Sequence, residues 1–309
     1  MDFTLSEELQ SVQQLAAQIL GDFTAVEQLK RIEQQDEHID RKLWQALAEA
    51  GLLGLDIAEN QGGMDLGFYS LATLCEEVGR TVAPVPVVPV LVGAAGTLRR
   101  FGSAEQQERW LPAIADGSQL VTSALEEYNN DDPARPACVA EPEGDGYRLA
   151  GTKICVSMAA AAGRILLPAA CGDGVVVVLV DPAGAGVTLN PQVVTSGETC
   201  HELVLEGVSV PASDVIAAGD DAQAAMSWAR QATRAALCAM AVGLCDRMMR
   251  MTGSYTSERE QFGRAIATFQ AVSHRLADCF IDVECLRVVT QQAASLIDQG
   301  KDAEEASTI

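Results

Sequence analysis

Basic residues are scarce in this chain of 309 residues, where 21 lysines and arginines stand against 43 aspartates and glutamates. The formal net charge is therefore −22. A surface that binds nucleic acid or an anionic membrane needs a patch of basic side chains. We therefore expect no nucleic acid and no membrane among the partners. A small anionic ligand is not excluded, since one local basic cluster suffices to hold it.

Long apolar runs and metal-ligand motifs are also missing. The longest apolar run, residues 85–95, is interrupted by two prolines and is too short to span a bilayer. The beginning of the chain lacks a charged segment followed by an apolar one, so we expect no signal peptide. The three histidines, His38, His201 and His274, show no metal-ligand spacing, so we expect no metal site.

None of the nine cysteines forms a Cys-x-x-Cys pair. Their odd number and apolar neighbours favour reduced, buried thiols, which predicts a cytoplasmic protein. A composition of 48% hydrophobic and 21% charged residues is typical of a soluble, globular protein. The length suffices for two or three domains with a sizeable core.

The chain divides into three compositional blocks. Residues 1–118 show long helical patterns broken by Gly and Pro, which predicts an N-terminal α-helical domain. Residues 119–215 contain short β-prone runs, such as residues 175–180 and 202–206, which predict a middle domain of strands. Residues 216–309 return to long helical patterns. The fold class expected is α+β with several domains.

Three local features give sharper expectations. Ser6 or Thr4 can cap the first helix. Residues 143–153 predict a hairpin with Asp145-Gly146 as its turn. The acidic residues 126–132 are interpreted as a solvated loop.

The most informative stretch is residues 255–278, which predicts a helix end, a glycine turn and the start of a second helix. Arg259 suits the negative end of a helix dipole, and Gly263 can take the left-handed conformation that ends a helix. Taken alone, Arg-x-x-Phe-Gly predicts only two helices in a hairpin whose Arg caps the first. The longer match, through Gln270 to Asp278, points further.

That longer segment resembles the part of an acyl-CoA dehydrogenase that contacts the ADP half of FAD across a subunit interface. Further segments match the same family in order and spacing: residues 1–10, 43–55, 76–80, 101–112 and 146–153. The resemblance implies an N-terminal helical domain, a central β-barrel domain and a C-terminal helical bundle. It also implies α,β-dehydrogenation of an acyl-CoA thioester in lipid metabolism, with electron-transfer flavoprotein as the electron acceptor.

The resemblance leaves the chain without a catalytic base. Relatives continue for several tens of residues beyond the point matching residue 309, and many carry the catalytic Glu there. Others carry it just before an Arg on the first C-terminal helix, where this chain has Thr233-Arg234. Asp220 and Asp221 lie more than three turns upstream and are expected in the first turn of that helix. We therefore assign no catalytic residue, and leave open whether the chain is naturally short or a fragment.

The chain's own flavin pocket also departs from the family. Relatives show Leu-Thr-Glu-Pro where this chain has Leu-Glu-Glu-Tyr, so Glu126 replaces the Thr that donates to the flavin pyrimidine edge. A buried carboxylate facing flavin carbonyl oxygens sets acceptor against acceptor, which is unfavourable. Cys155 replaces an aromatic residue that stacks on the flavin. Ser157 keeps a hydroxyl that could reach flavin N5.

We interpret the chain as the short subunit of a heteromeric dehydrogenase whose partner, a second family member, carries the catalytic Glu. It resembles the α₂β₂ heterotetramers of actinobacterial steroid catabolism, which implies a steroid-derived CoA thioester, with FAD shared with or held mainly by the partner. Two alternatives remain: a homo-oligomeric dehydrogenase seen as a fragment, and a non-enzymatic scaffold. Glu126 and Cys155 count against the first. Arg259, Phe262 and Gln270, which serve a neighbouring subunit's flavin in the family, count against the second.

Overall fold

The structure is a computed structural model that describes residues 6–308. Its contacts divide the chain into two compact units. The first unit comprises Met1–Ala25, Phe68–Ala83 and Arg234–Ile309, and the second comprises Val26–Gly67 and Pro84–Thr233. The boundaries expected from composition, near residues 118 and 215, follow a different criterion and stay a prediction.

The first unit is built from helices. They are α1 (Glu7–Phe23), α4 (Gly67–Thr81), the C-terminal part of α7 (Asp220–Glu258), α8 (Gln270–Asp298) and α9 (Glu304–Thr308). Ser6 caps α1, because its Oγ accepts a hydrogen bond from the Leu9 N–H at 3.2 Å. The alternative cap, Thr4, lies outside the described residues. Asp220 and Asp221 stand in the first turn of α7, which confirms their expected place.

Helices α4 and α7 approach closely at two glycines. A Cβ added to Gly79 would lie 2.0 Å from the carbonyl oxygen of Met240. One added to Gly243 would lie 1.8 Å from the carbonyl oxygen of Glu76. Any side chain at either position would force the two backbones apart, so the glycines are required for this crossing.

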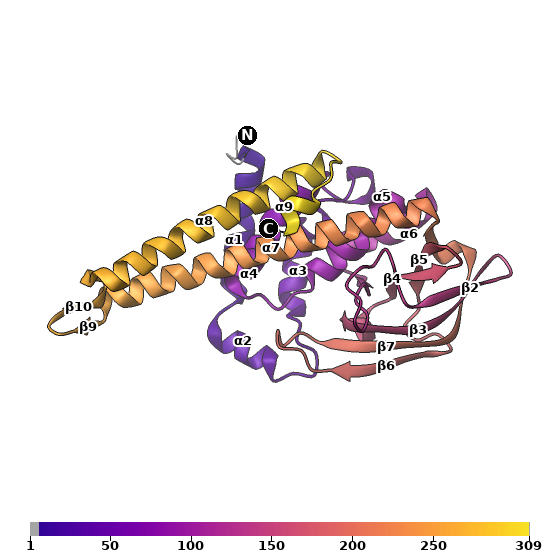
Figure 1. Cartoon of the computed structure of the whole chain (residues 1–309), viewed down its shortest axis with the longest axis horizontal. Coiled ribbons are helices and arrows are strands. Elements are labelled where there is room, and N and C mark those ends of the chain that lie inside the picture. Colours follow the sequence, from indigo (N-terminus) through magenta and orange to yellow (C-terminus); the bar gives the residue numbers. More distant parts are fainter. Residues whose placement is uncertain (1–5, 309) are drawn as a thin grey trace. The chain divides into compact units, whose positions relative to one another are not determined.

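Helices α7 and α8 form the long hairpin that the sequence predicts. Figure 1 shows them running side by side and antiparallel, with the connection at one end. That connection consists of β9 (Glu260–Gln261), β10 (Arg264–Ala265) and the short helical turn η6 (Ile266–Thr268). The two strands pair antiparallel. They were not predicted, since two-residue strands leave no periodic signal.

The second unit combines short helices with a sheet. Its helices are α2 (Val26–Glu33), α3 (Arg41–Glu49), α5 (Thr97–Phe101) and α6 (Ala104–Ala115), with the turns η1 (Leu52–Gly54), η2 (Glu59–Gln61), η4 (Ala159–Ala161), η5 (Ala212–Asp214) and the π-helical η3 (Val88–Gly96). Side chains cap two of them. Asp40 Oδ1 accepts from the N–H groups of Lys42 and Leu43 at the start of α3, and Ser103 and Gln106 form a capping box at α6.

The sheet is mixed and eight-stranded within the described part of the chain. Its strands are β1 (Val121–Ser123), β2 (Val139–Glu143), β3 (Gly146–Ser157), β4 (Arg164–Cys171), β5 (Gly174–Val180), β6 (Val187–Gln192), β7 (Cys200–Val210) and β8 (Val215–Ala218). Their order is β6-β7-β3-β2-β4-β5-β8, with β1 beside β4. The expected runs 175–180 and 202–206 lie in β5 and β7 and are confirmed. Leu149, Val178 and Leu203 are fully buried in its core.

Several local expectations need correction. Gly144 and Asp145 form the turn between β2 and β3, one residue earlier than expected, and Gly144 takes the positive φ of +62°. All nine cysteines are free, but the expectation of buried thiols is confirmed only for Cys75, Cys138 and Cys200. Four others are half-buried, and Cys155 and Cys285 are exposed. Within residues 6–308, no helix combines the length and the apolarity that crossing a membrane requires.

Candidate functional site

The connection between α7 and α8 holds three of the four site residues that the sequence singles out: Arg259, Phe262 and Gln270. Helix α7 ends at Glu258, and its last backbone bond runs from the Arg259 N–H to the Tyr255 carbonyl at 2.8 Å. The Ile266 N–H then donates to the Arg259 carbonyl at 2.9 Å, which closes the connection into a compact loop. This loop is called the hairpin tip below, and it comprises residues 259–270.

Two residues make the turn of the hairpin tip. Phe262 has φ +55° and Gly263 has φ +77°, and they join the paired residues Gln261 and Arg264. Two positive φ values in a two-residue loop fit a type I′ turn, whose twist matches that of the strands. The expectation that Gly263 ends the helix is therefore wrong, because four residues separate it from the last residue of α7.

Phe262 is held in an unfavourable conformation and points into solvent. A positive φ is rare for a bulky residue, and such outliers cluster at functional sites. Its side chain is 94% exposed. The ring meets Phe269 edge to face, with centroids 6.1 Å apart and planes at 83°. The hairpin tip therefore exposes an aromatic ring on a residue whose backbone conformation is unfavourable for phenylalanine.

The hairpin tip is basic, although the whole chain is acidic. Within residues 259–270, Arg259 and Arg264 stand against a single acidic residue, Glu260. Arg259 and Arg264 are exposed, and neither makes an ion pair with any residue that the structure describes. Gln270 is exposed in the first turn of α8, where unpaired N–H groups and the helix dipole favour an anion. The tip can therefore bind an anionic, aromatic ligand.

Ser157, the fourth predicted site residue, belongs to the second unit. It ends β3, pairs with Cys200 of β7, and its carbonyl accepts from Thr122 Oγ1 at 2.8 Å. Cys155 lies two residues earlier at an irregularity of the strand, with φ +53° and its N–H donating to Gln192 Oε1 at 2.7 Å. No contact of the Ser157 hydroxyl tests its flavin role, which stays a prediction.

The acidic loop is only partly solvated, because Glu127 is buried. Lys153, with no exposed surface, donates from Nζ to Glu127 Oε1 at 2.7 Å. The backbone N–H groups of Ala137 and Cys138 also donate to this carboxylate. Burial raises the pKa of the Glu127 carboxyl, but the hydrogen bonds from Lys153 and the two N–H groups outweigh it and lower the pKa to about 2. Glu126, in contrast, is exposed.

Sequence reasoning missed this buried pair, although a signal exists. Lys153 is four residues beyond Leu149 in β3, so the alternation of a strand sends both side chains to the buried face. A lysine at such a position requires an acidic partner. Glu127 anchors the loop that follows β1 against β3.

The segment around Arg234 also holds a contact that was not predicted. Arg234 donates from its guanidinium to Glu304 Oε1 of α9 at 2.9 Å. Thr233 Oγ1 is buried and has no hydrogen-bond partner among the described residues. Threonine cannot act as a base, and the Glu304 carboxylate is paired with Arg234. Both facts agree with the absence of a catalytic base in this segment, which stays a prediction.

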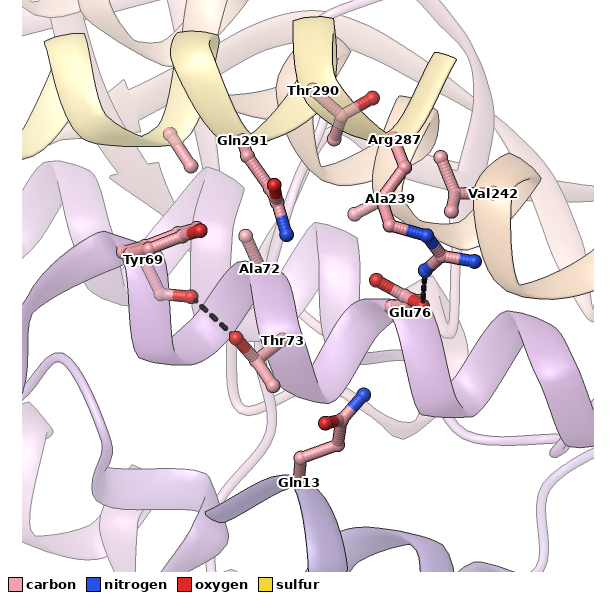
Figure 2. A pocket seen from close by; sticks show the side chains of 11 residues that line it. Gln13, Tyr69, Ala72, Thr73, Glu76, Ala239, Val242, Arg287, Thr290 and Gln291 are labelled. Atoms are coloured by element: carbon pink, nitrogen blue, oxygen red, sulfur yellow. Dashed lines mark hydrogen bonds and ion pairs between the residues drawn. The ribbon is translucent and has the colours of Figure 1, made fainter. Parts of the chain in front are cut away.

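A cavity of ≈ 240 Å³ lies in the first unit and is lined by residues of α1, α4, α7 and α8. Figure 2 shows the side chains that line it. Arg287 of α8 points toward Glu76 of α4 and pairs with it. Tyr69 and Gln291 point into the same space. Burial, followed by the charges of Glu76 and Asp298, raises the pKa of the Tyr69 hydroxyl. Since the charges of Glu76 and Arg287 neutralise each other, the cavity offers no free charge to an ionic ligand.

A second cavity, of ≈ 430 Å³, lies in the second unit beside the turn between β6 and β7. Asp36, Glu37 and Glu198 are among its lining residues, so the cavity repels an anionic ligand. Within residues 6–308, no group of three or more His, Cys, Asp or Glu side chains could hold a metal ion. Unlike these two cavities, the hairpin tip offers arginines that make no ion pair with a described residue, beside an exposed aromatic ring.

Comparison with known proteins identifies the family. The N-terminal domain model of acyl-CoA dehydrogenases matches residues 6–118, and the C-terminal domain model matches residues 223–309. Acyl-CoA dehydrogenase FadE27 of Mycobacterium tuberculosis is 33% identical over 294 residues, which cover 95% of this chain and 77% of that protein. The chain belongs to the acyl-CoA dehydrogenase family.

Solved structures of acyl-CoA dehydrogenases agree with the fold. A variant of the Tcur3481-Tcur3483 steroid ACAD is 41% identical and matches 98% of this chain and 81% of its own, with a TM-score of 0.91. The ChsE4-ChsE5 complex from Mycobacterium tuberculosis is 32% identical and matches 99% of this chain and 81% of its own, with a TM-score of 0.90. The predicted arrangement of helices, central strands and helices is thereby confirmed.

Binding of FAD is a property of this family. The FAD complex of PigA is 26% identical to this chain and has a TM-score of 0.88 over 99% of it. In the present chain, the unpaired arginines and the exposed ring of the hairpin tip fit the diphosphate and the adenine of such a cofactor. Glu126 and Cys155 are both exposed, and their expected effect on the chain's own flavin pocket stays a prediction.

Proposed function

We propose that this chain is a subunit of a heteromeric acyl-CoA dehydrogenase, and that it completes the FAD site of a partner subunit of the same family. The observation that carries the proposal is the hairpin tip. Arg259, Phe262 and Gln270 share one exposed connection, and Arg259 has no ion pair with any described residue. An unpaired arginine beside an exposed ring suits a diphosphate linked to an aromatic base.

The spacing along α7 supports a site shared between subunits. Arg234, which marks the segment that carries the base in some relatives, is separated from Glu258 by 24 residues of one helix. At about 1.5 Å per residue this is roughly 36 Å. One dinucleotide cannot span that distance along a rigid helix. The hairpin tip and the Arg234 segment therefore serve two different flavins.

When bound, FAD accepts the hydride in the dehydrogenation of an acyl-CoA thioester. In our proposal, Arg259 binds the diphosphate through charge-assisted hydrogen bonds, Phe262 covers the adenine, and Gln270 donates at the start of α8. Ser157 is proposed to approach the flavin of the chain's own subunit. The catalytic carboxylate comes from the partner, and electron-transfer flavoprotein is proposed as the electron acceptor.

The proposed substrate is a steroid-derived CoA thioester. Support comes from the relatives, since the 41% identical structure is that of the Tcur3481-Tcur3483 steroid ACAD. A 32% identical structure is that of the ChsE4-ChsE5 complex. Co-expression with family members encoded nearby, followed by assay with steroid and fatty acyl-CoA thioesters, tests the assignment. Turnover of straight-chain thioesters alone would contradict it.

The chain purified alone is expected to bind no flavin and to show no dehydrogenase activity. The reasons are Glu126 and Cys155 in the flavin segment and Thr233 at the position of the base. The measurement is the amount of flavin per chain, from the absorbance band of oxidised flavin at about 450 nm. One FAD per chain, bleached by an acyl-CoA, would support the homo-oligomeric alternative instead.

Arg259→Ala is expected to weaken FAD binding by the complex about ten- to hundred-fold. The loss follows from about 1.5–3 kcal/mol for a charge-assisted hydrogen bond. Phe262→Ala should act in the same direction. The measurement is FAD affinity of the co-purified complex by fluorescence titration. A scaffold without flavin predicts no change, whereas loss of co-purification would show that Arg259 only supports the hairpin.

A further inference from the structure

The sequence motif leaves two residues of the hairpin tip without a role, Arg264 and Phe269. Arg264 pairs with Gln261 across the short β9–β10 ladder. Its guanidinium carbon lies 4.1 Å from the centroid of the Phe269 ring. This distance is within the range of a cation–π contact. Phe269 also meets Phe262 edge to face, so a single ring contacts both an arginine and the exposed aromatic residue.

Phe269 is itself fixed by the backbone around it. It is the residue before α8, and its carbonyl accepts from the N–H groups of Val272 and Ser273 at 3.0 and 3.1 Å. Its own N–H donates to the Ile266 carbonyl at 3.1 Å. The ring therefore stands on a rigid helix start. A side chain that stacks on it gains a defined position at little cost in conformational entropy.

Arg264, which contacts this ring, has no acidic partner among the described residues. Arg80 and Arg287, elsewhere in the first unit, each pair with buried carboxylates. Arg264 makes no ion pair with any residue that the structure describes, and its side chain is exposed. A cation–π contact leaves the N–H donors of a guanidinium available, and their fork matches two phosphate oxygens. The contact with Phe269 therefore holds the Arg264 side chain without neutralising its charge.

We propose that Arg264 is a second residue that binds the diphosphate of FAD held by the partner, and that Phe269 is a positioning residue for both Arg264 and Phe262. The proposal rests on the proposed function and deepens it. Arg259 and Arg264 flank the β9–β10 turn, one before the first strand and one in the second. Two guanidinium groups so placed can each bind one phosphate of a nucleoside diphosphate.

The test uses the complex of the full chain with its partner. Arg264→Ala is expected to weaken FAD binding about tenfold or more, and Arg264→Lys should recover only part, because an ammonium keeps the charge without the fork. The loss should shrink at high salt, since it is electrostatic. Arg247→Ala is the matched control, an exposed arginine on α7 outside the tip, and should change affinity less than twofold.

Phe269 is tested by a double-mutant cycle with Arg264. Phe269→Leu should weaken FAD binding about three- to tenfold. Phe269→Tyr keeps an aromatic ring at this position and should leave the affinity close to that of the unchanged chain. The loss caused by Phe269→Leu should be smaller in the Arg264→Ala background, because the two residues act together. Equal losses in both backgrounds would assign Phe269 a structural role only.

The outcomes separate the two proposals. If Arg259→Ala and Arg264→Ala both leave FAD affinity unchanged in an intact complex, the proposed function is wrong. If Arg259→Ala weakens binding and Arg264→Ala does not, only this further inference is overturned. CoA carries a nucleoside diphosphate too, so its affinity is measured on the flavin-loaded complex. A change confined to CoA would reassign Arg264 to the substrate and contradict the proposal.

Discussion

Lys153→Met is expected to reduce the free energy of unfolding by about 3–5 kcal/mol, the range found when one partner of a buried ion pair is removed. Methionine replaces the unbranched stem of lysine, without its ammonium group, and leaves the Glu127 carboxylate buried with only its other hydrogen bonds. Lys153 has no exposed surface, so water cannot replace it. The measurement is urea unfolding of the full chain at pH 7, followed by circular dichroism.

The pH dependence gives this prediction a second readout. The pKa of Glu127 is about 2 in the folded protein, against 4.5 for the unperturbed group. A lowered pKa means that the carboxylate stabilises the fold above about pH 4.5 and that this stabilisation is lost as the pH falls toward 2. Removing Lys153 should flatten this part of the stability curve. An unaltered curve would show that the backbone N–H groups alone hold the carboxylate.

Arg41→Met is the matched control for Lys153→Met. Arg41 and Glu37 also form an ion pair, at 2.6 Å, but their side chains are 59% and 46% exposed. Exposed pairs contribute about 0–1 kcal/mol. A loss at Lys153 no larger than that at Arg41 would contradict the assignment of a buried pair.

Asp246→Asn should destabilise the first unit by about 3 kcal/mol. Asp246 is 1% exposed on α7 and pairs with Arg80 of α4, with Arg287 of α8 and, on its own helix, with Arg250. The amide keeps the shape and removes the charge, which leaves three arginines with fewer counter-charges. The expected loss lies at the lower end of the range because Glu76 still pairs with Arg80 and Arg287.

Thermal unfolding of Asp246→Asn is measured beside Glu258→Gln as its control. Glu258 is exposed at the end of the same helix, so its change should leave the melting temperature within about a degree. Equal shifts in the two variants would mean that the charge of α7, rather than the pairing of Asp246, determines stability.

The sequence predicts best what repeats along the chain. Strands β5 and β7 are recognised because each contains a short run of β-prone apolar residues, most of which the structure buries. The turn between β2 and β3 is misplaced by one residue because Gly144 and Gly146 flank Asp145. Local rules favour Asp-Gly, whereas the structure uses Gly-Asp, so the choice between two glycines depends on the register with the partner strand.

Contacts between distant residues are less predictable. Glu127 and Lys153 are 26 residues apart, and the run of acids around Glu127 hides the one that is buried. At the hairpin tip, Arg259, Phe262 and Gln270 are visible as a family motif, but the role of Phe269 needs coordinates. Local rules give the positive φ to Gly263 alone, since phenylalanine disfavours it, so the turn geometry at Phe262 was also missed.

The unpaired arginines of the hairpin tip imply a link between cofactor supply and assembly. On the proposed function, the tip raises the partner's affinity for FAD by some factor. Thermodynamic reciprocity then requires FAD to raise the affinity of the two subunits for each other by the same factor. Without the cofactor, the positive charges of Arg259 and Arg264 would stand at the interface with no phosphate to balance them. FAD would thus stabilise the association of the two subunits. At a given protein concentration, the fraction of subunits in the complex would then depend on the concentration of free FAD.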